Sequence, residues 1–134
     1  MIDDFMALSE TLTGIGGLDR ALGIQYLERC KGNDLVSGTL NDLLAVFAKI
    51  RSDGSDPVAA TKSRILGDAR LGWAAQQIIF LWYVSAFWRP NPSNAQKGTW
   101  EYDGPPEHYG RGLMWTAIGA HAPMVSPSEW SKGL

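Results

Sequence analysis

The sequence is short of several residue types that define whole classes of protein. It holds one cysteine, Cys30, and two histidines in 134 residues. A single cysteine excludes an internal disulfide framework and a cysteine-rich zinc site. Two histidines without clustered carboxylates argue against a transition-metal site. Twelve Lys and Arg against fourteen Asp and Glu give a net charge of −2, so we expect no binding to nucleic acid, which requires a basic face.

Long hydrophobic runs are also missing. The most apolar stretch, residues 78–88 (IIFLWYVSAFW), is closed by Arg89 and Pro90. It is about half the roughly 20 residues that a spanning helix needs, so we expect no transmembrane segment. The N-terminus has no basic region and no twin arginine, which predicts a cytoplasmic protein as written. The alternative is a periplasmic protein from which a twin-arginine leader has been removed.

Apolar residues at helical spacing predict four helices, over residues 1–14, 18–30, 39–52 and 57–88. Asp3 or Asp4 is expected to cap the first helix and Thr39 the third, and Gly14 is expected to end the first. The fourth is expected to begin at Asp56 and Pro57, with Gly67 and Gly72 as weak points.

The composition changes after Arg89, where Pro, Gly and polar residues dominate. Strand-like alternation is absent, and a short helix is expected only at residues 112–119. We therefore predict an all-α fold with a roughly four-helix core. The chain is expected to form a single helical domain, residues 1–134. Its core would be residues 1–88, and residues 89–134 would form a long, irregular, extended arm.

No catalytic, cofactor-binding or metal-binding residue is predicted. The run Gly14-Ile15-Gly16-Gly17 lacks the strand and the lysine of phosphate-binding loops, which favours a turn between helices. His108 and His121 lack an orienting carboxylate at a suitable spacing, which favours a structural hydrogen-bonding role. Cys30 is expected as a small, partly buried side chain, and a bridge to a partner stays open.

Aromatic residues gather in the C-terminal half of the chain. Tryptophan and tyrosine beside Pro-rich extended segments are typical of protein–protein surfaces, although core packing explains such residues equally well. The gathered residues are Trp82, Tyr83, Phe87, Trp88, Trp100, Tyr102, Tyr109, Trp115 and Trp130.

Three segments together resemble a known family. They are FMALSETLTGIGGLD (residues 5–19), QQIIFLWYVSAFW (76–88) and YGRGLMWTAIGAHAPM (109–124). In this order they resemble the small subunit of membrane-associated, FAD-containing sorbitol, fructose and glucose dehydrogenases. The resemblance implies a non-catalytic helical subunit that binds and stabilises a large FAD-containing oxidoreductase of the glucose-methanol-choline (GMC) type. A cytochrome c subunit often completes such complexes, and the FAD is expected in the large subunit.

Such a role predicts that the aromatic C-terminal half provides the partner interface. The residues expected there are Trp82, Tyr83, Trp88, Tyr109, Leu113, Met114, Trp115, His121, Pro123 and Trp130. The alternative is a stand-alone helical enzyme or ligand-binding protein. It would use His121, with Trp115 and Tyr109 lining a pocket.

Overall fold

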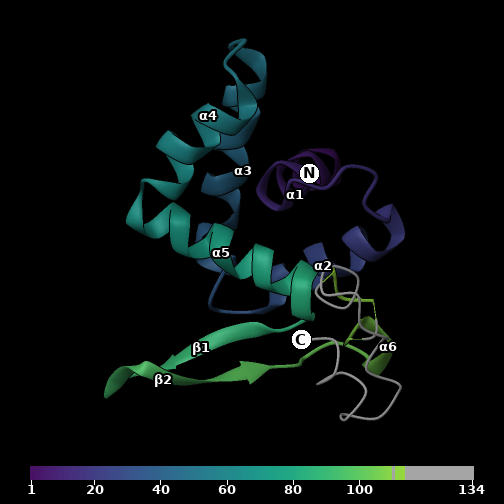
Figure 1. The fold of residues 1–134 in the computed structure, drawn as a ribbon, viewed down its shortest axis with the longest axis vertical. Helices are drawn as coiled ribbons and strands as arrows, with labels where there is room; N and C mark the ends of the chain where they lie inside the picture. Colours follow the sequence, from purple (N-terminus) through teal and green to yellow (C-terminus); the bar gives the residue numbers. More distant parts are fainter. Residues whose placement is uncertain (110, 114–134) are drawn as a thin grey trace, which may run out of the picture. The chain divides into compact units, whose positions relative to one another are not determined.

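Helices make up most of the chain that the structure describes, and a two-stranded sheet follows them (Figure 1). The structure is a computed structural model, and it describes residues 1–109 and 111–113. The elements are, in order, α1 (Ile2–Thr13), α2 (Arg20–Gly32), α3 (Ser37–Ser52), α4 (Pro57–Thr61), η1 (Lys62–Leu66), α5 (Ala69–Val84), β1 (Phe87–Asn91), β2 (Asn94–Glu101) and α6 (Pro106–Tyr109). The chain falls into two compact units, Met1–Ile79 and a second that begins at Phe80, within α5.

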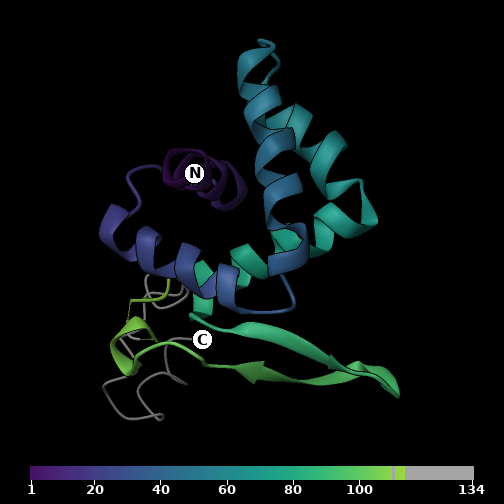
Figure 2. The ribbon, with the colours of Figure 1, turned by 180° about the vertical axis from the view of Figure 1, so that it is seen from behind.

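Helix α1 contacts α2, α3 and α4 of the first unit (Figures 1 and 2). Its residues Phe5 and Leu8 are fully buried. The helix ends as predicted at Gly14, whose φ of 72° lies in the left-handed region that glycine adopts without a steric penalty. The turn that follows leads into α2, and the two helices contact each other.

The predicted carboxylate cap of α1 is wrong. Met1 is the N-cap residue and makes no side-chain capping bond, while Asp3 and Asp4 lie in the first turn. There they form ion pairs with other helices: Asp3 with Arg20 of α2 at 2.8 Å, and Asp4 with Arg51 of α3 at 2.9 Å. The acidic first turn still complements the helix dipole, but these carboxylates connect helices.

Helices α2 and α3 each bury one apolar face. Ile24 of α2 points outward and is 47% exposed, whereas Cys30 in its last turn is fully buried. Helix α3 begins at Ser37, so Thr39 lies inside it and is not its cap. The apolar stripe of α3 is buried as predicted: Leu40, Leu43, Leu44, Phe47 and Ile50.

The predicted fourth helix begins where expected but is divided. Asp56 caps it by accepting a hydrogen bond from the Val58 N–H at 3.1 Å, and Pro57 occupies the first turn. A five-residue π-helical turn, η1, then ends at Gly67, one of the two predicted weak points. Asp68 starts α5 by accepting from the N–H groups of Arg70 and Leu71, both at 2.9 Å.

The prediction of a purely α-helical chain is wrong for residues 87–101 of the second unit. After α5 the backbone turns at Ser85, whose φ is 59°, and enters β1. Strands β1 and β2 pair antiparallel (Figure 1). Trp88 lies opposite Trp100, and Pro90 lies opposite Gly98. Residues 87–101 thus form a hairpin rather than an irregular arm. Proline, glycine and a register shift after Pro90 interrupt the alternation by which a hairpin is identified in a sequence.

Replacing Gly67 by alanine is expected to destabilise the protein, because a Cβ there would lie 2.6 Å from the Ser63 carbonyl oxygen, which belongs to rigid helix backbone. We expect a loss of about 1–3 kcal/mol of unfolding free energy, measured by thermal or urea denaturation. The control is Gly38→Ala, a helical glycine with nothing within 4 Å of a new Cβ. This control should stabilise by about 0.5–1 kcal/mol. If both substitutions changed the free energy of unfolding equally, a steric conflict between position 67 and the Ser63 carbonyl oxygen would be ruled out.

Candidate protein-interaction surface

One face of the hairpin is aromatic. Residues two apart in a strand and directly paired residues share a face, so the register places Trp88, Pro90, Gly98 and Trp100 together. We call these four residues the aromatic face. The Trp88 and Trp100 rings meet edge to face with centroids 5.0 Å apart, an arrangement that aromatic pairs prefer.

Gly98 is required by this packing. A Cβ at position 98 would lie 2.8 Å from Cζ2 of Trp88 and 2.4 Å from the Arg89 carbonyl oxygen. Any larger residue would therefore push the indole of Trp88 away or separate the strands. Gly98 interrupts the strand pattern in the sequence, and in the structure the indole of Trp88 lies over it.

The opposite face of the hairpin holds a buried aromatic residue and an ion pair. Phe87 is fully buried. Arg89 donates from Nε to one carboxylate oxygen of Glu101 and from Nη2 to the other at 3.4 Å. This pairing across the strands supports the register found at Phe87–Glu101 and Arg89–Thr99. The charge of both partners is balanced there, and the aromatic face itself carries no charged residue.

The aromatic face is only half covered in the described structure. Trp100 contacts Phe80 of α5, with ring centroids 5.2 Å apart and planes at 88°, yet it is 40% exposed. Tyr102, directly after β2, is 52% exposed. Large exposed aromatics are the residue types that dominate binding energy at protein–protein interfaces.

The predicted interface residues have different environments. Trp82 is 2% exposed and so presents little surface to a partner. Tyr83, Trp88 and Leu113 are partly exposed, and Tyr109 lies in α6. The remaining predicted residues lie outside the described part of the chain: Met114, Trp115, His121, Pro123 and Trp130. The structure thus gives no account of the pocket expected around His121.

Two exposed aromatics, Trp100 and Tyr102, were absent from the predicted set. A signal for them existed in the sequence, because Trp100 and Tyr102 are spaced two apart behind a Gly-Thr pair. That spacing is typical of one face of a strand. His108, for which a structural hydrogen-bonding role is expected, is 3% exposed and lies in α6.

Hollows elsewhere in the described chain are open to solvent. One of about 360 Å³ follows α5 and is lined by Leu66, Asp68, Ala69, Gly72, Trp73, Gln76 and Ile79. Another, of about 420 Å³, includes Phe47, Arg51 and Val58 of the first unit. Among residues 1–109 and 111–113, no three His, Cys, Asp or Glu side chains gather as metal ligands. In the same residues, no helix combines the length and apolarity needed to cross a bilayer.

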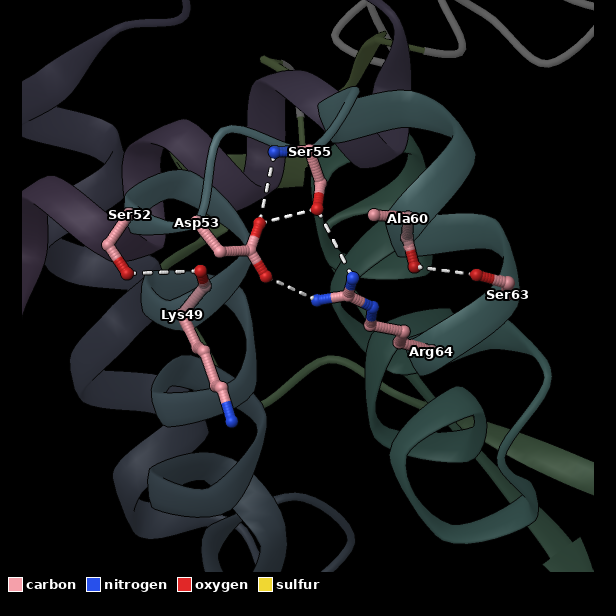
Figure 3. Close-up of polar contacts among 7 residues, drawn as sticks. All are labelled: Lys49, Ser52, Asp53, Ser55, Ala60, Ser63 and Arg64. Carbon is pink, nitrogen blue, oxygen red and sulfur yellow. Dashed lines mark hydrogen bonds and ion pairs between the residues drawn. The ribbon is translucent and has the colours of Figure 1, made fainter.

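A polar cluster links the end of α3 to η1 (Figure 3). Asp53 accepts from Arg64 Nη1 at 2.8 Å, from the Ser55 N–H at 3.0 Å and from the Ser55 hydroxyl. Arg64 Nη2 also donates to the Ser55 hydroxyl at 3.2 Å. These bonds, led by the one from Arg64, lower the pKa of Asp53 to about 2. The cluster lies at the surface and holds the 53–56 turn against η1.

Comparisons with known proteins do not place the chain in a family. No family profile, curated protein or solved structure matches it.

Acid is expected to weaken the Asp53 cluster. The pKa of Asp53 in the folded state lies below its ordinary value of 3.8, so its contribution to stability is complete above about pH 4. That contribution is lost as the pH falls toward 2, because protonation removes the acceptor of the Arg64 bond. Urea denaturation from pH 5 to pH 2 should show a smaller loss of stability for Asp53→Asn than for the parent chain.

A matched control removes one carboxylate from a simpler exposed pair. Asp42 accepts one hydrogen bond, from Arg70 Nη2 at 2.8 Å, whereas Asp53 accepts three, so Asp42→Asn should change the parent's acid dependence less than Asp53→Asn does. If the two variants lose stability alike between pH 5 and pH 2, the Asp53 cluster does not contribute in the way that its contacts indicate.

Proposed function

We propose that this chain is a non-catalytic accessory subunit that binds and stabilises a large FAD-dependent sugar or sugar-alcohol dehydrogenase of the GMC type. The proposal combines the sequence resemblance with one structural observation, the half-covered aromatic face of the hairpin. The sugar chemistry and the flavin would belong to the partner, since hydride transfer is a property of the cofactor and its site. A cytochrome c would accept electrons from that complex where one is present.

The exposed aromatics support a binding role for energetic reasons. An isolated two-stranded hairpin is only marginally stable in water and normally needs cover from a helix or further strands. Phe80 covers one edge of Trp100, but two-fifths of Trp100 and half of Tyr102 stay in contact with solvent. Burial of these rings against a partner would both stabilise the hairpin and contribute hydrophobic binding energy.

The partner surface that suits this face is apolar with few charges. The aromatic face holds no charged side chain, and the nearby Arg89 and Glu101 neutralise each other on the opposite face. A charged partner surface would lose hydration there without gaining an opposite charge. Binding would therefore depend little on salt, in contrast to an interface formed by ion pairs.

Capture of the partner tests the proposal. A tagged chain expressed in its native host should retain a yellow flavoprotein near 1:1, and the eluate should reduce a dye when a sugar or sugar alcohol is added. Trp100→Ala should weaken this capture by about 30-fold in Kd, the equivalent of a 2 kcal/mol interface hot spot. Trp100→Phe, which keeps a ring against Phe80, should lose less.

Ile24→Ala is the matched control, because Ile24 is a similarly exposed hydrophobic residue, 47% exposed, in the first unit. It should capture the flavoprotein as well as the parent chain does. Circular dichroism of each variant verifies that the fold is kept. A colourless eluate from the parent chain would rule out the flavoprotein partner. Equal capture by Trp100→Ala and Ile24→Ala would rule out the aromatic face as its binding surface.

A further inference from the structure

Within residues 1–109 and 111–113, the second strand of the hairpin has one edge with no neighbouring strand. The sheet of the described chain contains only β1 and β2, so the side of β2 that faces away from β1 has no neighbouring strand. Outside the ladder, no backbone hydrogen bond joins residues 97–100 to another part of the described chain. We call this side, from Lys97 to Glu101, the β2 edge.

Proline decides which backbone groups the β2 edge presents. In an antiparallel ladder, pairs that exchange both hydrogen bonds alternate with pairs that exchange none. Pro90 has no N–H, so its pair with Gly98 is of the second kind. Trp88–Trp100 is then also of the second kind, in which side chains approach more closely, as their 5.0 Å ring separation shows. The N–H and C=O groups of Gly98 and Trp100 therefore point outward along the β2 edge.

The edge of β1 carries a proline, whereas the β2 edge has no such feature among the described residues. Pro90 removes one of the outward donors of β1, which is a common way to prevent strand addition. The β2 edge contains no proline, and its small residue Gly98 leaves the backbone accessible. Its one cation, Lys97, is exposed and forms no ion pair within the described residues.

We propose that the β2 edge binds the β2 edge of a second copy of this chain, antiparallel and centred on Thr99, to form a four-stranded sheet. In this register Gly98 lies opposite Trp100 of the second copy, and each such pair exchanges both of its outward hydrogen bonds. The two-fold axis passes between the two Thr99 residues, so every contact is made twice. The inference does not depend on the proposed flavoprotein partner.

Charge complementarity favours a second copy over an unrelated strand. The same register places Lys97 directly opposite Glu101 of the second copy, on the face that also carries Arg89. Opposite charges directly across two strands are stabilising, and like charges are destabilising. A shift by one residue in either direction would lose the Lys97–Glu101 pair and would place residues from opposite faces side by side. Sequence and ladder thus agree on one symmetric register.

A cysteine at the proposed axis tests the register. The Thr99–Thr99 pair is of the kind without hydrogen bonds, with Cα atoms about 4.5 Å apart, which is within reach of a disulfide. Thr99→Cys should therefore form a covalent dimer rapidly under mild oxidation. Cys30 is buried and should not react. The control is Ser93→Cys at the exposed hairpin tip, which the register separates from its counterpart by on the order of 40 Å.

A charge at the axis provides the second test. Thr99→Glu places a carboxylate beside Arg89 of its own hairpin, so the hairpin should be kept. It also places two carboxylates together across the axis. Light scattering and sedimentation of the purified full chain should show a dimer for the parent. Thr99→Glu should raise the dimer Kd at least about fivefold, consistent with roughly 1 kcal/mol for a cross-strand pair. Ser93→Glu, with the same added charge, should stay dimeric.

The proposal fails if the parent chain is monomeric at all concentrations tested, or if Thr99→Cys is oxidised to a dimer no faster than Ser93→Cys. It also fails if a dimer forms but Thr99→Glu and Ser93→Glu affect it equally, because the contact then lies elsewhere. Capture of a flavoprotein by the tagged chain has no bearing on these outcomes. The two proposals can therefore fail separately.

Discussion

The contact between Trp88 and Trp100 is the interaction on which the second unit's hairpin depends. A two-stranded ribbon with short strands has little else to hold it, and β1 is only five residues long. The indole pair adds about 0.5–1.5 kcal/mol beyond the area that it buries. The partly exposed Arg89–Glu101 pair on the other face adds about 1 kcal/mol. The packing is possible because position 98 is glycine, which lets the Trp88 ring lie against the opposite strand.

The helical part of the fold could be predicted from the sequence because its signals are local. Gly14 ends α1 and Asp56–Pro57 starts α4, each through bonds within a few residues. The buried stripe of α3 follows from its spacing alone. The error at Thr39 is one of helix boundary, because α3 begins two residues earlier, at Ser37. The errors at Asp3 and Asp4 share another cause. A capping residue looks the same in the sequence whether its oxygen meets the first free N–H groups or a distant arginine, and only the tertiary structure decides.

The hairpin could not be predicted in the same way, because its signals contradict one another locally. Pro90 lies within β1, Gly98 lies within β2, and the register shifts between Pro90 and Asn91. Each of these features reads as a loop signal in isolation. In the structure each feature has a specific place. Pro90 lies where its backbone nitrogen faces away from β2, Gly98 lies beneath the indole of Trp88, and the register shift lies next to the turn. The information resides in pairs of residues across the strands, which a single sequence does not display.

Exposure, and therefore the binding surface, was the least predictable property. Trp82 and Trp100 are the same residue type in the same half of the chain, yet one is 2% and the other 40% exposed. Trp82 is buried in a helix, whereas Trp100 lies partly exposed on a hairpin. The number of aromatic residues alone therefore could not distinguish core residues from surface residues.

The geometry also shows why the two proposed contacts can coexist. The partner flavoprotein would cover a face of the sheet, whereas a second copy would use its edge. A standard protein interface buries about 800 Å² on each side, which is large for the face of one two-stranded hairpin. Pairing through the β2 edge would place two aromatic faces side by side on one four-stranded sheet. Dimerisation through the β2 edge would thereby enlarge the aromatic surface that is available to bind the flavoprotein.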